Sequence, residues 1–291
     1  MIINLKYHVA SLAAVFFALG IGVLAGAAMA GNDFFLSRQE QLIRDIQAQV
    51  SSQQEANRRT TRALTAMEQD SAFQKQFNQV ALPILIRDRL QGRTVAIIDL
   101  DYQKEHERLA AALRTAGALI QSTTVVNLGV LKDVEVNRRL AFYFGKEPGA
   151  APEKYLPDLA RSLASAIAIG RPDNLAQSLR ELEIIKATVN TGAPPQDIIL
   201  IGGSNGRELD YARSFDLIMI KTWKTEGARV FGTEDSMAPV SYVRYYEQAG
   251  IATIDDIDTA YGQVALVGAM AGHPGHYGIK QTAESFIPPL L

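Results

Sequence analysis

The sequence predicts an α/β fold: an N-terminal transmembrane helix and a coiled-coil helix, followed by a doubly wound, mostly parallel sheet domain. Three features indicate this class: a charge-free apolar run, a heptad repeat after it, and short apolar strands that alternate with helices. We expect an anchor region at 1–31, a stalk at 32–82 and a globular domain with a C-terminal tail at 83–291. The chain has no cysteine, which excludes disulfides and thiolate metal sites. Its net charge of −2 offers no basic surface for nucleic acid.

The apolar run from Val9 to Gly31 contains no charged residue. At about 1.5 Å per residue it spans roughly 34 Å, enough to cross a bilayer core of about 30 Å. A buried core helix is the alternative, but such a helix rarely lacks charge over six turns. Ala28-Met29-Ala30 resembles a signal-peptidase site, although the run is longer than most signal sequences, so we favour an uncleaved anchor. Lys6 ahead of the run favours a single-pass cell-membrane topology with the N-terminus inside and the globular domain outside.

Small residues recur at every fourth position of this run and therefore line one face of the predicted helix. Small side chains let two membrane helices approach closely, and the GxxxG pair within the set is a known packing motif. Alanine and glycine are also common in membrane helices in general. The pattern is therefore explained either by self-association through this face or by the usual composition of such helices. The face consists of Ala14, Ala18, Gly22, Gly26 and Ala30.

The stretch from Asn32 to Leu82 lacks proline and glycine, which is typical of one long helix. Apolar residues repeat there every seven positions, with a companion row three residues later, as in the a and d positions of a coiled coil. Asn57 at an a position fixes register in such helices. A single amphipathic helix lying on the globular domain is the alternative, and we favour a parallel homodimer. The predicted seam comprises Leu36, Ile43, Ile46, Val50, Asn57, Leu64 and Met67.

Near its end the predicted stalk becomes more apolar. Phe73, Phe77 and Val80 widen the stripe, as we expect where a stalk meets a globular core. Pro83 then predicts the end of the helix.

Beyond Arg93 the chain alternates short β-branched runs with helical patterns, which predicts four to six strands with helices on both faces. Several helical segments are expected between the second and third strands, through about Val189. The clearest strands are expected at 94–100, 122–128, 197–203, 228–234 and 251–257, and the last helix at 262–272.

Ligands bind at the carboxyl ends of strands in such sheets, so the loops at these ends are candidate sites. Asp99 and Asp101 close the first strand and offer ligands for a hard cation, or else cap a turn. Gly202, Gly203 and Ser204 follow a later strand, where backbone amides bind an anion or form a tight turn. The glycine loop matches no nucleotide-binding fingerprint. In both loops we favour a structural turn over a ligand site.

Two histidines, His273 and His276, lie close together in a glycine-rich tail. They are candidate metal ligands, copper included, although two ligands do not make a site. We favour histidines that bond the backbone, and we expect no cofactor.

Both ends of the chain resemble the MctB-like family, the mycobacterial copper-transport protein B family. At the N-terminus the similar stretch is YHVASLAAVFFALGIGVLAG (7–26). At the C-terminus it is 245–279, with an Asp-Asp-x-Asp turn, Gly-Gln-Val and the closing motif Gly275-His276-Tyr277-Gly278. The order of helix, stalk, α/β domain and tail also matches.

The resemblance implies a role in copper homeostasis, because members are labelled copper transporters and an outer-membrane channel has been proposed for the mycobacterial case. A corynebacterial relative is instead tied to daughter-cell separation, where its external coiled coil acts on a cell-wall hydrolase. Three functions therefore stand as hypotheses. We rank a non-enzymatic dimeric envelope scaffold with a protein partner first, a copper transport or homeostasis component second, and an α/β enzyme with a site at the strand ends last.

Overall fold

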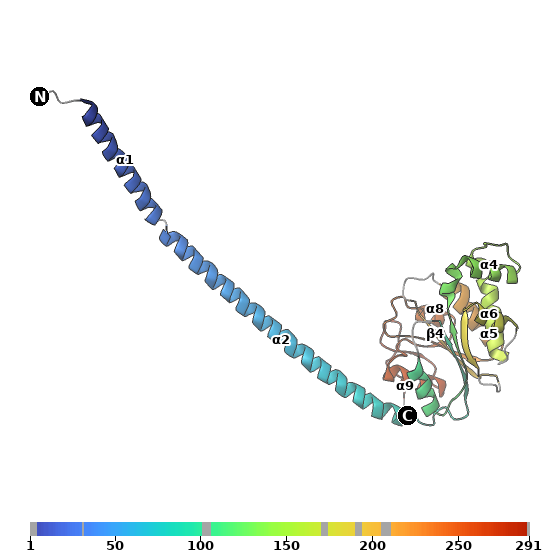
Figure 1. Ribbon diagram of the computed structural model, residues 1–291. Coiled ribbons are helices and arrows are strands. Elements are labelled where there is room, and N and C mark those ends of the chain that lie inside the picture. Colours follow the sequence, from blue (N-terminus) through green and yellow to red (C-terminus); the bar gives the residue numbers. More distant parts are fainter. Residues whose placement is uncertain are drawn as a thin grey trace. The chain divides into compact units, whose positions relative to one another are not determined.

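The computed structural model describes residues 5–30, 32–100, 106–169, 174–189, 194–204 and 211–289. The chain divides into two compact units, residues 1–74 and 75–291. Figure 1 shows the elements in chain order. The order confirms the predicted class, since an apolar helix and a long helix precede an α/β sheet domain.

The first helix, α1, spans Leu5–Ala30. Its segment Lys6–Met29 is long and apolar enough to cross a membrane, and no part of its most apolar window is buried in the rest of the structure. A core helix of a soluble protein would be covered by its own chain. By length and composition, α1 meets the requirements for a membrane span.

The second helix, α2, runs over 55 residues from Asn32 to Ile86, about 82 Å at the usual rise. The expectation that Pro83 ends it is wrong, because the last turn continues and the amide of Arg87 donates to the Pro83 carbonyl at 3.1 Å. Ile86 is buried in the core of the α/β domain. This burial offsets the backbone hydrogen bond that proline removes. The join at Gly31 lies outside the described residues.

The sheet has seven strands in the order β3-β2-β1-β4-β5-β6-β7, all parallel except the pair β2 and β3. Seven strands exceed the predicted four to six by one, and β3 and β7 are not among the strands expected from the sequence. The expected helical pattern through Val189 ends instead in an edge strand, in which apolar and exposed polar residues alternate over only five positions. β7 has two residues, too few for any periodic signal. The strands are β1 Thr94–Asp99, β2 Leu119–Val126, β3 Ile185–Val189, β4 Asp197–Gly202, β5 Arg229–Glu234, β6 Ala252–Ile254 and β7 His276–Tyr277.

Helices cover both faces of the sheet because successive residues of the central strands point to opposite sides. Ala96 and Ile98 of β1 face one core, and Val95 and Ile97 face the other. The first core is covered by α4 Val134–Tyr143, α5 Leu156–Ile169, α6 Asn174–Glu181, α7 Leu217–Thr225 and α8 Val243–Gln248. The second is covered by α3 Glu107–Thr115, α9 Ala260–Met270 and the end of α2. Short helical turns complete the domain: η1 Leu128–Lys132, η2 Pro152–Lys154 and η3 Ala212–Asp216.

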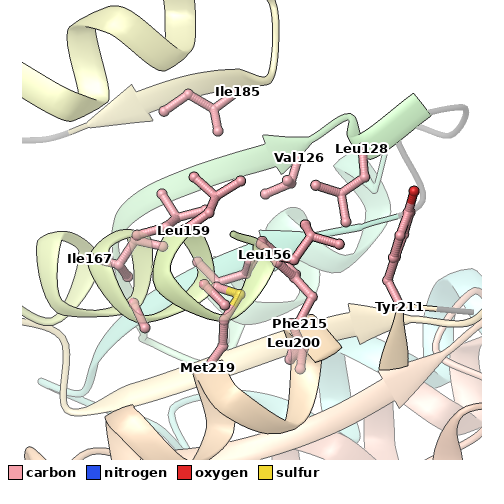
Figure 2. Close-up of a cluster of buried hydrophobic side chains, with 14 of the residues drawn as sticks. Val126, Leu128, Leu156, Leu159, Ile167, Ile185, Leu200, Tyr211, Phe215 and Met219 are labelled. Atoms are coloured by element: carbon pink, nitrogen blue, oxygen red, sulfur yellow. The ribbon is translucent and has the colours of Figure 1, made fainter. Parts of the chain in front are cut away.

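Large apolar side chains fill the first core. Figure 2 shows Leu156 and Leu159 of α5 between Val126 of β2 and Phe215 of η3. In the second core α9 is buried along almost its whole length, which explains why its sequence is apolar on all sides. The two cores hold the sheet in place and leave its strand ends free to carry polar groups.

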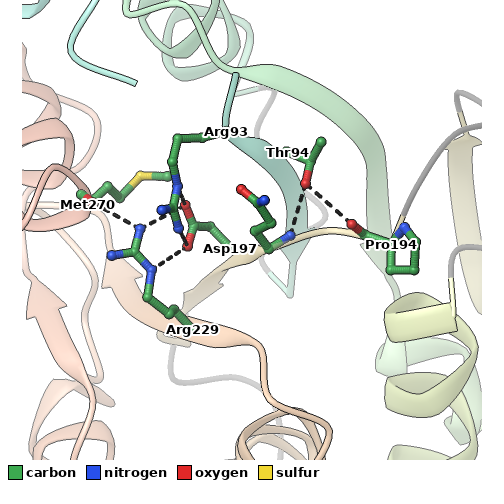
Figure 3. Close-up of polar contacts among 7 residues, drawn as sticks. Arg93, Thr94, Pro194, Asp197, Arg229 and Met270 are labelled. Atoms are coloured by element: carbon green, nitrogen blue, oxygen red, sulfur yellow. Dashed lines mark hydrogen bonds and ion pairs between the residues drawn. The ribbon is translucent and has the colours of Figure 1, made fainter. Parts of the chain in front are cut away.

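At the amino-terminal ends of the strands, one buried carboxylate joins three neighbouring strands (Figure 3). Asp197 of β4 is fully buried and accepts two hydrogen bonds each from Arg93, ahead of β1, and Arg229 of β5, at 2.6–3.0 Å. Arg229 also donates to the carbonyl of Met270 at the end of α9, at 2.9 Å. Asp197 thus links the centre of the sheet to a helix on one face.

Replacing Asp197 by alanine is expected to destabilise the α/β domain by about 2–4 kcal/mol, because charge-assisted bonds are lost at a buried site. Asp158→Ala is the matched control. Asp158 also contacts two cations, Lys146 and Arg161, but at a partly exposed site, so its loss should cost under about 1 kcal/mol. Denaturant titration of the full chain in detergent measures both costs. The fluorescence of Trp223, the single and fully buried tryptophan, reports unfolding of this domain. Equal costs would contradict the role assigned to Asp197.

Candidate functional site at the carboxyl ends of the strands

The strand order creates a topological switch point between β1 and β4. From β1 the chain moves outward to β2, whereas from β4 it moves the other way to β5. In open α/β sheets, ligands bind in the crevice at this point. Asp99 at the end of β1 pairs in register with Ile201, so the Asp99 and Gly202 loops, which the sequence identifies separately, are neighbours. Asp101 lies outside the described residues.

A histidine lies between two buried carboxylates near this point. Nε2 of His106, just ahead of α3, lies 3.3 Å from Oδ2 of Asp99, and its Nδ1 lies 4.0 Å from Oδ1 of Asp235, which follows β5. The sequence identifies neither His106 nor Asp235 as a site residue. The one available signal is that Glu234-Asp235 closes a strand, as Asp99 does.

The glycine turn after β4 is closely packed. A Cβ on Gly202 would fall 1.9 Å from Oη of Tyr246, and Gly203 has a φ of +93°, which favours glycine. Ser204 exchanges two backbone hydrogen bonds of 3.0 Å with Val240. The Oη of Tyr246 donates to Asp216 at 2.5 Å, and burial together with this carboxylate raises the pKa of Tyr246 well above its ordinary value. The described part of this loop is therefore fixed by contacts within the domain.

Glu234, at the end of β5, is fully buried and ion-paired. It accepts hydrogen bonds from the Ser241 hydroxyl at 2.6 Å, the Tyr242 amide at 2.8 Å and the Lys280 ammonium at 2.6 Å. Lys280 also donates to the carbonyl of Asp235 at 3.1 Å. These bonds compensate the buried charge and tie the C-terminal tail to β5.

Two carboxylates of the Asp-Asp-x-Asp turn after β6 accept hydrogen bonds from neighbouring segments of the chain. Asp255 accepts hydrogen bonds from the amides of Ile279 and Lys280 at 2.8 and 3.0 Å. Asp258 accepts from the amide and hydroxyl of Ser236 at 2.7 and 2.8 Å. Gly278 allows the tail to lie against Asp255, since a Cβ there would fall 2.0 Å from Oδ1. The first and last carboxylates of this turn thus have structural partners.

The two central residues of the tail motif Gly275-His276-Tyr277-Gly278 form the seventh strand, β7. Nδ1 of His276 lies 2.9 Å from the Thr253 hydroxyl, and the Tyr277 hydroxyl donates to the carbonyl of His273 at 2.8 Å. The residue His273 is exposed. Within the part of the chain that the structure describes, no group of three histidine or carboxylate side chains is placed to hold a metal ion.

Asp256, in the middle of the turn, differs from its neighbours. It is fully buried, and neither of its carboxyl oxygens has a hydrogen-bond partner among the described residues. Its Oδ1 lies against Gly262 in the first turn of α9, where a Cβ would fall within 2.5 Å. Burial, followed by the charges of Asp255 and Asp258, raises the pKa of Asp256 to about 7, although Lys280 opposes the shift.

This raised pKa predicts a pH-dependent stability. Between the ordinary pKa of 3.8 and about 7, folded Asp256 keeps a proton that the unfolded chain has lost. The free energy of unfolding should therefore fall as pH rises through this window, by up to about 4 kcal/mol. Asp256→Asn should remove this contribution. Denaturant titrations of both proteins at pH 4.5 and 7.5, followed by Trp223 fluorescence, measure the difference. An unchanged slope in the variant would contradict the assignment.

Comparison with known proteins agrees with the resemblance at the two ends of the chain. A family model described as "Copper transport outer membrane protein, MctB" matches residues 2–288. Curated proteins named "Copper transporter MctB", from Mycobacterium bovis and Mycobacterium tuberculosis, are 24% identical over 317 residues. The alignments cover 97% of this chain and 98% of each relative.

Proposed function

The chain belongs to the MctB family, and we propose that it is a non-enzymatic, membrane-anchored scaffold that dimerises in parallel through α2 and presents its α/β domain to an envelope partner. The observation that carries this proposal is the exposed apolar seam along α2. In the proposed topology α1 crosses the cell membrane once, with the N-terminus inside and the globular domain outside.

The seam has the pattern and the exposure of a coiled coil without its partner. Its large apolar residues are 48–72% exposed, and they are Leu36, Ile43, Ile46, Val50, Leu64 and Met67. Burying such a side chain stabilises an association by about 1.5–3 kcal/mol before entropy costs. The positions between them are mostly polar or charged, so a narrow two-helix seam suits α2 better than burial in a broad core.

The small-residue face of α1 supports the same dimer. A Cβ built on Gly22 or on Gly26 would meet nothing within 4 Å, so this face is open to close approach by a second helix. Ala18 and Ala14 lie on the same face, about one and two turns before Gly22. Because α1 and α2 are consecutive in the chain, one parallel dimer would satisfy both surfaces.

The contacts at the carboxyl ends of β5 and β6 favour a scaffold over an enzyme. Glu234, Asp255 and Asp258 are engaged in hydrogen bonds that hold the tail and the neighbouring loop. Carboxylates used in this way stabilise the domain, and we propose no catalytic role for them.

Charge in the seam should break the dimer. We expect Ile43→Glu to convert the full chain in detergent from dimer to monomer, because it places two like charges at facing a positions. Ala48→Glu, on the outer face of the same helix, is the control and should remain dimeric. Sedimentation velocity distinguishes the two states. A monomeric native protein, or an Ile43→Glu dimer as stable as the control, would contradict the scaffold.

Copper transport or homeostasis is the second candidate, favoured by the names of the relatives. His273 and His276 are the residues that we assign to it. Our proposal predicts that the full chain retains less than one equivalent of copper in equilibrium dialysis with Cu(I) or Cu(II). It also predicts that the double variant His273→Ala/His276→Ala behaves like the native protein. Stoichiometric copper that disappears in the double variant would favour the copper function instead.

A further inference from the structure

An open groove lies between α7 and α8 on the surface of the α/β domain. Its volume of about 470 Å³ falls within the range of about 300–1,000 Å³ that is usual for ligand sites. Leu217 and Ile220 of α7 and Tyr245 of α8 provide much of its apolar surface. Lys221 and Lys224 are its charged lining residues. The groove therefore combines apolar walls with cations.

Two smaller cavities continue this groove. The first adjoins it at Lys224, extends to Arg229 at the start of β5 and has a volume of about 250 Å³. The second, of about 200 Å³, shares residues 250–252 with the first. Because each cavity shares lining residues with the next, the three form one continuous depression. We call it the basic trough, and its lysine and arginine lining residues are Lys221, Lys224 and Arg229.

The basic trough has no acidic side chain among its described lining residues. The whole chain has 31 acidic and 29 basic residues, so composition alone does not predict such a surface. Two glutamates adjoin lining residues in the sequence, but neither lines the trough. Glu226 accepts a hydrogen bond from Ser165 of α5 at 2.6 Å, and one side-chain oxygen of Glu247 is buried. The trough therefore has a local excess of positive charge.

Lys221 and Arg229 supply this excess. Lys221 is exposed, and its ammonium group has no hydrogen-bond or ion-pair partner in the part of the chain that the structure describes. Arg229 shares the single carboxylate of Asp197 with Arg93, so this cluster keeps one net positive charge. Both cations can therefore pair with an anionic group from outside the domain.

Two further cations favour an anionic occupant of the groove. Nζ of Lys224 donates to the carbonyls of Ala249 and Gly250 at 2.8 and 3.3 Å, which compensates the partial negative charge at the end of α8. Cζ of the exposed Arg213 lies 5.3 Å from the centre of the Tyr245 ring. Apolar, aromatic and cationic groups therefore meet at one end of the trough.

The shape of the basic trough suits a segment of polypeptide better than a small molecule. Small ligands bind in cavities that cover about 70–90% of their surface, whereas this depression is open. An extended peptide points alternate side chains to opposite sides. Its apolar side chains can enter the cavities while the carboxylates between them reach the cations of the trough.

We propose that the basic trough binds an acidic segment of a protein partner, with large apolar side chains between α7 and α8 and carboxylates paired with Lys221 and Arg229. This inference rests on the proposed function, because it assigns a surface to the envelope partner of the scaffold. The positive charge of the trough would speed encounter with an acidic partner and disfavour basic ones.

Peptide selection tests the proposal. A random library of phage-displayed peptides is selected on the full chain in detergent, and the peptides that bind are synthesised with a fluorescent label. We expect them to combine aspartate or glutamate with large apolar residues, and their binding should weaken as salt is added. Recovery of no binding peptide, or of peptides without acidic residues, would overturn the proposal.

Charge reversal then locates the binding surface. Lys221→Glu should weaken binding of a selected peptide by about tenfold or more in fluorescence anisotropy, because it reverses a charge that faces the peptide. Thr225→Glu, which adds a carboxylate to the groove and removes no lysine, should also weaken it. Lys186→Glu, at an exposed position of the edge strand β3, is the matched control and should bind like the native chain.

A peptide variant separates a charge effect from loss of folding. Each glutamate or aspartate of the selected peptide is replaced in turn by lysine. One of these peptides should bind Lys221→Glu more tightly than the parent peptide does. Equal losses in Lys221→Glu and Lys186→Glu, or no recovery with any of the substituted peptides, would contradict the assigned site.

The dimer variant separates this inference from the proposed function. The basic trough lies within one α/β domain, so Ile43→Glu should bind the peptide with the affinity of the native chain, and loss of binding would contradict this placement. If the native chain is monomeric but binds acidic peptides at the trough, the scaffold fails and the trough stands. If the chain is dimeric but selects no acidic peptide, the trough fails and the dimer stands.

Discussion

Burial of the apolar seam along α2 is the interaction on which the proposed assembly depends. The helix is 55 residues long, and the large apolar residues of its seam are exposed. Isolated helices gain little stability from propensity alone, so a helix of this kind needs tertiary or quaternary contacts. In the proposed dimer a second copy supplies these contacts, and the neighbouring small-residue face of α1 would fit the same partner.

The α/β domain uses its polar strand ends mainly for its own cohesion. At the amino ends Asp197 links three strands, and at the carboxyl ends Glu234 and Asp255 hold the tail that forms β7. The region where many sheets of this order bind ligands therefore carries a network of structural carboxylates. Asp256 differs from these three carboxylates, because neither of its buried oxygens has a hydrogen-bond partner among the described residues and burial raises its pKa to about 7.

Local pattern was sufficient for the features that depend on neighbours in sequence. The apolar runs at β1, β4 and β5 and the all-apolar α9 are found close to where the sequence predicts them. β3 was missed because a five-residue edge strand has little periodicity, and β7 because its two residues are held by bonds to β6. The end of α2 was mispredicted at Pro83 because burial of Ile86 in the core, a tertiary contact, outweighs the local tendency of proline to end a helix.

The candidate site depends even more on contacts that local sequence pattern does not predict. Asp99 and Gly202 stand out in the sequence as strand ends, but only the strand order makes them neighbours. His106 follows Asp99 by only seven residues, but its approach to Asp235 joins residues far apart in the chain, and no spacing signals this approach. Phe73, Phe77 and Val80 stand out in the sequence as apolar, yet Leu82 and Ile86 are the residues near the end of α2 that contact the core, which the pattern of the helix does not reveal.

The most direct test of the central claim is whether α2 pairs in parallel and in register. Spin labels placed in turn at Gln41, Ala48 and Arg62, all outer positions of the predicted heptad, give distances between copies of the full chain in lipid. A parallel dimer predicts the same narrow distance at all three positions. No dipolar coupling at any of them, or distances that change steadily along the helix, would contradict the account.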